Sequence, residues 1–211
     1  MQPDLGSVLV LLSIWFTLLL IAGLHWRYFI ITAFFSGLSF ISGWLWFLKD
    51  YQKDRLRVFL DPSLDPLGQG YNVIQSIIAI GSGGFWGKGL GYGSQSQLHF
   101  LPEAHTDFIF AVIAEQLGFI GIFFLLIFYG FLFYKIWQIA KEAPDNFSKF
   151  LAVGIMIFFL VHVGINIGMN LGLMPVIGIP LIFLSYGGSS MLVSFLAIGL
   201  LQAVRRRSRV W

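Results

Sequence analysis

The sequence predicts an all-α polytopic membrane protein, with about five transmembrane helices and one long loop outside the membrane. Its 211 residues are 57% hydrophobic and only 11% charged, whereas a soluble domain carries roughly 25% charged residues. Several apolar runs reach the roughly 18 residues that mark a membrane span. The absence of cysteine excludes disulfides, thiolate metal sites and a cysteine nucleophile.

The candidate spans fall into two groups, separated by the long loop. Each is close to the roughly 20 apolar residues needed to cross a bilayer, and the third is long enough to tilt or project. They cover residues 6–24, 28–48, 108–137, 150–170 and 187–204. The chain therefore divides into two membrane helices (1–48), a large extracytoplasmic loop (49–107), and three membrane helices with a basic tail (108–211).

The orientation follows from the basic residues, because Lys and Arg gather in cytoplasmic loops and tails. With five spans, the first turn, the loop after the third span and the C-terminal tail share one side. The basic residues there are Arg27, Lys135, Lys141, Lys149, Arg205, Arg206, Arg207 and Arg209. We therefore expect a cytoplasmic C-terminus, with the tail as a topology anchor rather than a nucleic-acid site. "MQPDLG" offers no positive n-region, so no cleavable signal peptide is expected.

The outer loop of 59 residues is too long for a plain connection, and loops of that size are functional or disordered. Apolar and aromatic residues persist through it, which argues against disorder. "KDYQKDRLRVFL" is typical of a helix lying on the membrane surface. "NVIQSIIAIGSGGF" is apolar enough for an interfacial or partly re-entrant hairpin, while its glycines disfavour a full span.

A second irregular region is "LGLMPVIGIPLIFLSYGGSS", residues 171–190. Pro175 and Pro180 interrupt helical hydrogen bonding, and Gly187 with Gly188 permits a sharp turn. Non-helical backbone at membrane depth persists only where protein or a water-filled cavity covers it. This segment is therefore predicted to line a cavity facing the long loop.

Acidic residues gather where the long loop meets the third span, in "FLPEAHTDF". Asp107 or Thr106 could cap that span, or Asp107 could be a desolvated general base, and the residues alone leave both open. Glu115 lies two helical turns further on. An ionisable residue within a span is by default a functional candidate, although a polar contact to a neighbouring helix, through Gln116, is an equal alternative.

Two further patterns are polar. "GSGGFWGKGLGYGSQSQ", residues 81–97, is either a flexible turn or a loop whose amides and Lys88 hold phosphate oxygens; it matches neither nucleotide fingerprint. His162, Asn166 and Asn170 share one helix face, which favours interhelical hydrogen bonds. "DPSLDPLGQGY" reads as a capped turn, with a looser cation role left open.

At these residues the chain resembles the SEDS family (shape, elongation, division and sporulation) of bacterial cell-wall proteins. The matching stretches are "QPDLG" (2–6), "FLDPSLDPLGQGYNVIQS" (59–76), "IGSGGFWGKGLGYGSQSQLHFLPEAHTDFIFAVIAEQLG" (80–118) and "NIGMNLGLMPVIGIPLIFLSYGGSS" (166–190). "QPDLG" together with "SQSQLHFLPEAHTDF" resembles the rod-shape branch rather than the division branch. The match corresponds to the C-terminal half of a ten-helix fold, so a fragment or a misassigned start is expected.

The resemblance implies a peptidoglycan glycosyltransferase that polymerises lipid II at the outer face of the bacterial cytoplasmic membrane, for cell elongation and rod shape. Asp107, in "HTDF", is implied to be the general base, and undecaprenyl pyrophosphate the leaving group. A cation at the pyrophosphate is expected to be Lys88, a divalent metal (Mg or Mn) whose ligands are unknown, or both. The implied substrate-binding residues are Lys88, Gln95, Gln97, Glu103, His105, Tyr186 and Ser189.

The implied partners are a class B penicillin-binding protein with transpeptidase activity and other elongation-complex proteins; no nucleic acid is expected. A lipid II flippase is the first alternative, but a transporter should keep polar residues across the full membrane depth, and here they gather at the outer end. The second alternative is a non-catalytic scaffold, for which Asp107→Asn should leave function intact.

Overall fold

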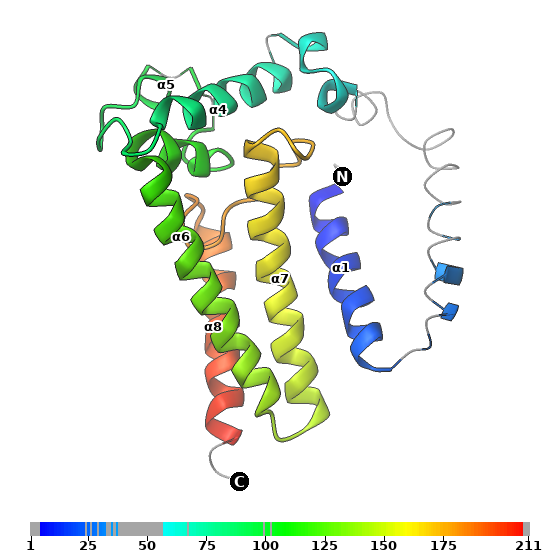
Figure 1. Ribbon diagram of the computed structural model, residues 1–211. Helices are drawn as coiled ribbons and strands as arrows, with labels where there is room; N and C mark the ends of the chain where they lie inside the picture. Colours follow the sequence, from blue (N-terminus) through cyan, green and yellow to red (C-terminus); the bar gives the residue numbers. More distant parts are fainter. Residues whose placement is uncertain are drawn as a thin grey trace.

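A computed structural model describes residues 5–23, 25, 27–28, 30–32, 35, 37, 57–66, 68–98, 100–101 and 103–208. Every regular element in that part of the chain is a helix (Figure 1), so the predicted all-α class is confirmed. Most of the predicted span 28–48 and most of the predicted surface helix in "KDYQKDRLRVFL" lie outside the described residues, and both stay predictions.

Three of the described helices are long and apolar enough to cross a membrane: α6 (Ile109–Lys141), α7 (Asn146–Asn170) and α8 (Gly188–Ser208). A shorter apolar helix, α1 (Leu5–Ile21), runs beside α7 (Figure 1). These four helices correspond to the first, third, fourth and fifth predicted spans. The predicted polytopic membrane protein is therefore confirmed, with each boundary of these four helices within four residues of the prediction.

The outward faces of these helices are apolar. Large side chains such as Leu11, Phe124 and Leu196 are each 65% exposed. In water such a surface would be an aggregation hazard, whereas lipid tails cover it without cost. The chain is an integral membrane protein.

The helix α6 differs from the straight span that the sequence predicts, because it breaks at Gly118. This residue has φ 65° and ψ −162°, a conformation open essentially to glycine alone. The break exposes backbone groups in the middle of the helix. The loop at residues 84–89 pairs with them: Phe119 N–H donates to Gly84 O (2.9 Å) and Lys88 N–H donates to Glu115 O (3.0 Å).

The long loop, over its described residues, forms a cap over one end of the bundle. The helix α4 (Gln69–Gly83) lies across the ends of α6 and α7 (Figure 1), as one continuous helix where a hairpin was expected. Before it, η1 (Pro62–Leu64) is capped by Asp61, whose carboxylate accepts from Ser63 N (3.1 Å). The capped turn predicted for this segment is confirmed. The short helix α5 (Ser94–Gln97) follows.

Residues 171–187 form no helix, as the two prolines predict. This segment lines one cavity of about 340 Å³ with α1 and α7, and a second of about 60 Å³ with η1 and α4. The predicted cavity wall facing the long loop is therefore present.

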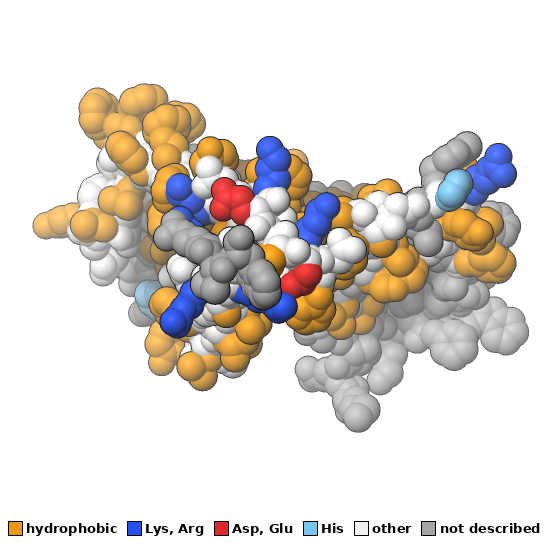
Figure 2. Space-filling model, turned by 90° about the horizontal axis from the view of Figure 1, so that it is seen from below, with side chains coloured by type: hydrophobic (Ala, Val, Ile, Leu, Met, Phe, Trp, Pro, Cys, Tyr) orange, Lys and Arg blue, Asp and Glu red, His pale blue; other side chains and the backbone are white. Residues whose placement is uncertain are grey.

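The two ends of the bundle differ in charge. The end opposite α4 carries the turn between α6 and α7 and the end of α8, and Figure 2 shows Lys and Arg side chains gathered there. Asp145 caps α7 by accepting from Ser148 N (2.7 Å), and Arg207 of α8 lies 3.5 Å from the same carboxylate. The described basic residues of that end include Lys141, Lys149, Arg205, Arg206 and Arg207.

Candidate functional site

The turn before α6 carries the acidic cluster. Glu103 has a positive φ of 54°, and its carbonyl accepts from the amides of Thr106 (3.1 Å) and Phe108 (3.3 Å). The N-cap of α6 is Phe108, and neither Thr106 nor Asp107 bonds an amide of the first helical turn through its side chain within the described residues. The alternative in which Thr106 or Asp107 caps this helix is therefore wrong, and the Asp107 carboxylate is not used for that purpose.

The backbone of Asp107 is held by two buried asparagines of α7. Asn166 and Asn170 each donate from Nδ2 to the carbonyl oxygen of Asp107, at 2.9 and 3.0 Å. Both side chains are fully buried. The interhelical hydrogen bonds predicted for this polar face are thus confirmed, but the sequence did not reveal what they hold. The available signal was a pair of amides, four residues apart, inside an apolar helix.

The irregular segment holds the same turn from the other side. Ser185 donates from Oγ to Thr106 O (2.5 Å) and accepts from the amide of Leu181 (2.7 Å). The amide of Tyr186 donates to His105 O (2.8 Å). Sequence reasoning missed Ser185, because one serine in a polar stretch carries no distinctive pattern. Three carbonyls in a row, those of His105, Thr106 and Asp107, are therefore bonded to distant parts of the chain.

The Asp107 side chain is partly buried and lies beside Gly178. A Cβ atom on Gly178 would lie 3.6 Å from Asp107 Oδ2, and Gly178 also lines the 340 Å³ cavity. Partial burial, and secondarily the charge of Glu103, raise the pKa of the Asp107 carboxyl above its ordinary value. Its carboxylate has no hydrogen-bond partner within the described part of the chain. A free carboxylate with a raised pKa suits a general base.

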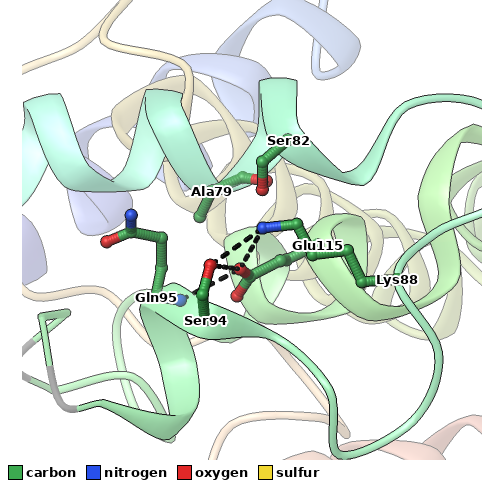
Figure 3. A network of polar contacts seen from close by, with 6 residues as sticks. All are labelled: Ala79, Ser82, Lys88, Ser94, Gln95 and Glu115. Carbon is green, nitrogen blue, oxygen red and sulfur yellow. Dashed lines mark hydrogen bonds and ion pairs between the residues drawn. The ribbon is translucent and has the colours of Figure 1, made fainter.

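Lys88 belongs to a second polar cluster, at the break in α6. Its Nζ lies 3.1 Å from Glu115 Oε1, and Glu115 is fully buried. The same oxygen accepts from Gln95 N (3.0 Å) and Ser94 Oγ (3.3 Å), so the glycine-rich loop, α5 and α6 meet there (Figure 3). Glu115 thus makes the polar contact that was one of its two alternatives, although with Lys88 rather than through Gln116.

The glycine-rich loop uses part of its polar capacity within the protein. The amides of Lys88 and Gly89 donate to the carbonyls of Glu115 and Gln116, each at 3.0 Å. These two amides are therefore not available to hold a phosphate. The binding of pyrophosphate by the Lys88 ammonium, whose side chain is 31% exposed, stays a prediction.

The remaining predicted substrate residues fall around these two clusters. Glu103 and His105 lie in the turn of Asp107, and the amide of Tyr186 bonds to that turn. Gln95 lies at Glu115, and the buried Oε1 of Gln95 has no hydrogen-bond partner within the described part of the chain. Gln97 and Ser189 are exposed, as is Tyr186 at 82%. Their substrate roles stay predictions. No three His, Asp or Glu side chains converge among the described residues, and the divalent cation stays a prediction.

The Lys88–Glu115 pair gives a prediction on stability. Lys88→Met should destabilise the protein by about 2–4 kcal/mol, because it leaves a buried carboxylate without its cation. Glu115→Gln should cost only about 1–2 kcal/mol, because the partly exposed lysine can turn to water. The double variant should cost less than the sum of both. Thermal unfolding in detergent measures all three, with Lys149→Met as an exposed control.

The same three variants separate a structural Lys88 from a phosphate-binding one. If the lysine only balances Glu115, the double variant recovers activity together with stability. If it also holds pyrophosphate, stability recovers and activity does not. Additive losses of stability would contradict the buried pair itself.

The fold and this site define a polytopic helical membrane protein in which a partly buried carboxylate, unpartnered within the described residues, directly precedes the longest described helix. The family model described as FtsW/RodA/SpoVE cell cycle protein matches residues 1–210. The chain therefore belongs to this family, and the resemblance seen in its motifs is confirmed. It is 46% identical over 210 residues to "Peptidoglycan glycosyltransferase MrdB" of Escherichia coli strain K12, covering 99% of this chain and 56% of the relative.

Two further relatives are a protein named for sporulation and another named as a probable peptidoglycan glycosyltransferase. "Stage V sporulation protein E" of Bacillus subtilis strain 168 is 42% identical, with 99% of this chain and 56% of that protein covered. "Probable peptidoglycan glycosyltransferase FtsW" of Trichlorobacter lovleyi is also 42% identical, with 95% and 52% covered. The chain thus spans about half the length of the curated relatives it matches.

Two solved structures have the same fold. A chain of a peptidoglycan synthase complex, whose structure concerns the coordination of polymerization and crosslinking, aligns with a TM-score of 0.77 and 37% identity. It is covered to 56%, and this chain to 97%. An aspartate-to-alanine mutant of the rod shape determining protein RodA of Thermus thermophilus aligns with a TM-score of 0.61 and 28% identity, covering 97% of this chain and 51% of that one.

Proposed function

We propose that this chain carries the acid–base centre of a peptidoglycan glycosyltransferase that polymerises lipid II, with Asp107 as the general base. The observation that carries the proposal is the Asp107 carboxylate, which is partly buried, has a raised pKa and is unpartnered within the described residues. Two relatives named as peptidoglycan glycosyltransferases, at 46% and 42% identity, support the reaction class.

In the proposed reaction Asp107 removes the proton from the sugar hydroxyl of the acceptor. The resulting oxygen attacks the anomeric carbon of the donor, the bond between that carbon and the pyrophosphate oxygen breaks, and undecaprenyl pyrophosphate leaves with the electron pair. Burial supports this assignment because it raises the pKa of the base toward the working pH, where general bases act best. The divalent cation at the pyrophosphate remains a prediction, and the proton transfer is assigned to Asp107 alone.

The orientation that we propose places Asp107 at the outer face of the cytoplasmic membrane and the C-terminus in the cytoplasm. It is supported by the basic end of the bundle, which lies opposite α4 and the acidic turn, because Lys and Arg favour cytoplasmic ends. An outer site suits a lipid-linked substrate whose sugars face outward.

The proposed partner is a class B penicillin-binding protein that cross-links the new strands, together with other proteins of cell elongation. The structural relative from a complex that coordinates polymerization and crosslinking supports a cross-linking partner. The 46% identity to MrdB, together with the rod-shape motifs, supports the elongation role.

The test uses the product of the complete gene, purified with its transpeptidase and placed in liposomes that contain labelled lipid II. We expect glycan strands from the wild type and at most traces from Asp107→Asn. Movement of lipid II between leaflets without polymer would favour a flippase instead. A scaffold would do neither, and polymer formed equally by both proteins would contradict the base assignment.

Glu103 provides a prediction on pH dependence. The base must be ionised, so activity should fall as the pH drops through the raised pKa of Asp107. The charge of Glu103 contributes to that raised pKa, so Glu103→Gln should move the acidic limb of kcat/KM toward lower pH. Initial polymerisation rates from pH 4.5 to 8, roughly spanning the carboxyl range, measure the shift. If the acidic limb of kcat/KM in Glu103→Gln stayed in place or moved to higher pH, this prediction would be wrong.

A further inference from the structure

The start of α6 breaks a strong local preference. Asp is among the best N-cap residues, and an N-cap uses its carbonyl to accept the first helical hydrogen bond. Here the N-cap is Phe108, which has no capping group, although Asp107 is the adjacent residue. Something outside the helix must therefore oppose the cap that the sequence favours.

The opposing group is the side-chain amide of Asn170. A regular helix continued by one residue would join the amide of Ala111 to the carbonyl of Asp107. Instead, the Ala111 N–H donates to Asn170 Oδ1 (3.1 Å), and Asn170 Nδ2 donates to Asp107 O (3.0 Å). One asparagine thus occupies both halves of the missing helical bond. Asn166 adds a second donor to the same carbonyl at 2.9 Å.

Asn170 is itself fixed in place on several sides. Its Nδ2 also donates to Asn166 O (2.8 Å), and Ser76 of α4 donates to Asn170 O (2.8 Å). Asn170, Asn166 and Ser76 are all fully buried. A buried, fully bonded amide has little freedom to move. The loss of the helical bond between Ala111 N–H and Asp107 O is therefore a stable feature of the fold.

The interruption has a chemical consequence. As an N-cap, the Asp107 carboxylate would accept hydrogen bonds from amides of the first helical turn. Hydrogen bonds to the charged form lower a carboxyl pKa and would make Asp107 a weaker base. They would also turn the carboxylate toward the helix and away from Gly178, its neighbour at the cavity wall.

We propose that Asn170, assisted by Asn166, is a positioning residue for the general base: it intercepts the first hydrogen bond of α6 and thereby keeps Asp107 from capping the helix. This inference rests on the proposed function of Asp107. It concerns how the free state of that carboxylate is maintained.

The test compares Asn170→Ala with Tyr129→Phe in the complete gene product. Tyr129 also makes a buried bond between α6 and the irregular segment, to Ile182 O (2.6 Å), but it has no bond to the turn of Asp107. Both variants lose buried hydrogen bonds, so both should lose stability. Only Asn170→Ala should lower kcat, by about 10- to 100-fold with KM changed less than threefold, since base catalysis contributes about 10²–10⁴-fold.

The pH profile separates positioning from mere support of the fold. In Asn170→Ala the acidic limb of kcat/KM should move to lower pH, because the newly capping carboxylate has a lower pKa. In Tyr129→Phe the limb should stay where it is in the wild type. If Asn170→Ala does not fold, Asn166→Ala removes the second donor to Asp107 O and a bond to Ile179 O (2.8 Å) but leaves Asn170 in place. Its kcat should lie at least threefold below that of Tyr129→Phe.

The outcomes distinguish the two proposals. Normal kcat and an unmoved limb in Asn170→Ala, with Asp107→Asn inactive, would overturn the positioning role and leave the base assignment standing. If Asn166→Ala is used instead, a kcat equal to that of Tyr129→Phe would also overturn the positioning role. Full activity of Asp107→Asn would overturn the base assignment and the positioning inference together.

Discussion

Asp107→Asn should lower the rate of lipid II polymerisation by about 10²–10⁴-fold, the usual contribution of a general base. Asparagine has the same shape as aspartate but cannot accept the proton from the acceptor hydroxyl. The bonds that hold this residue run through its carbonyl to Asn166 and Asn170, so the backbone should stay in place. Initial rates at matched amounts of folded protein measure the effect.

The stability of Asp107→Asn should not fall with its activity. A carboxyl whose pKa is raised by folding binds its proton more tightly in the folded state. Its contribution therefore favours folding at low pH and is lost as the pH rises through the raised pKa. Asp107→Asn removes that loss, so at neutral pH the variant should be at least as stable as the wild type. A lower unfolding temperature would show that the carboxylate is structural.

Asp61→Asn is the matched control for this prediction. It makes the same chemical change in the same outer loop, at a carboxylate that caps η1 through Ser63. We expect polymerisation rates close to the wild type. If Asp61→Asn lost as much activity as Asp107→Asn, the rate would respond to loop charge in general. If Asp107→Asn kept more than a tenth of wild-type activity, Asp107 would not be the general base.

Gly118→Ala should be the most destabilising single change in α6, with a loss of about 3–5 kcal/mol. Gly118 has φ 65°, and an added Cβ would overlap the backbone nitrogen of Gly87 and lie 2.7 Å from Phe85 O. The backbone there cannot retreat without breaking the pairs that join the loop to the helix, including Ile120 N–H to Phe85 O (3.3 Å). Thermal unfolding in detergent measures the loss.

The control is Gly130→Ala, in the same helix. A Cβ on Gly130 would meet nothing within 4 Å, and alanine favours helix over glycine by about 1 kcal/mol. This variant should be neutral or slightly more stable. If Gly118→Ala were equally mild, α6 could run straight through this point, and the docking of the glycine-rich loop would not depend on the break.

Local sequence patterns were sufficient for the membrane class and for most element boundaries. Apolar runs of the right length marked α1, α6, α7 and α8, and Pro175 with Pro180 marked the irregular segment. The capping role of Asp61 could also be predicted, because its partner Ser63 lies two residues away. These features depend on neighbours in the chain, so the sequence alone determined them, as it did the family.

Tertiary structure decided how the site is held. Asn166 and Asn170 meet Asp107 across 59 and 63 residues, and Ser185 meets Thr106 across 79. A helical periodicity tells which face is buried, but not which distant backbone group that face will bond. The break at Gly118 was hidden for the same reason, because it is stabilised by a loop about 30 residues away.

The N-terminus of α6 shows the difference most clearly. By sequence, Asp107 or Thr106 is the natural cap, since both residue types accept bonds from free helical amides. In the fold, Asn170 takes the amide and the carbonyl that such a cap needs, and Phe108 becomes the N-cap. The sequence by itself determined that an acid stands at the membrane boundary. Only the packing of α7 against α6 decided that its carboxylate stays free, because a buried amide from a distant helix outcompetes a local preference of about 1 kcal/mol.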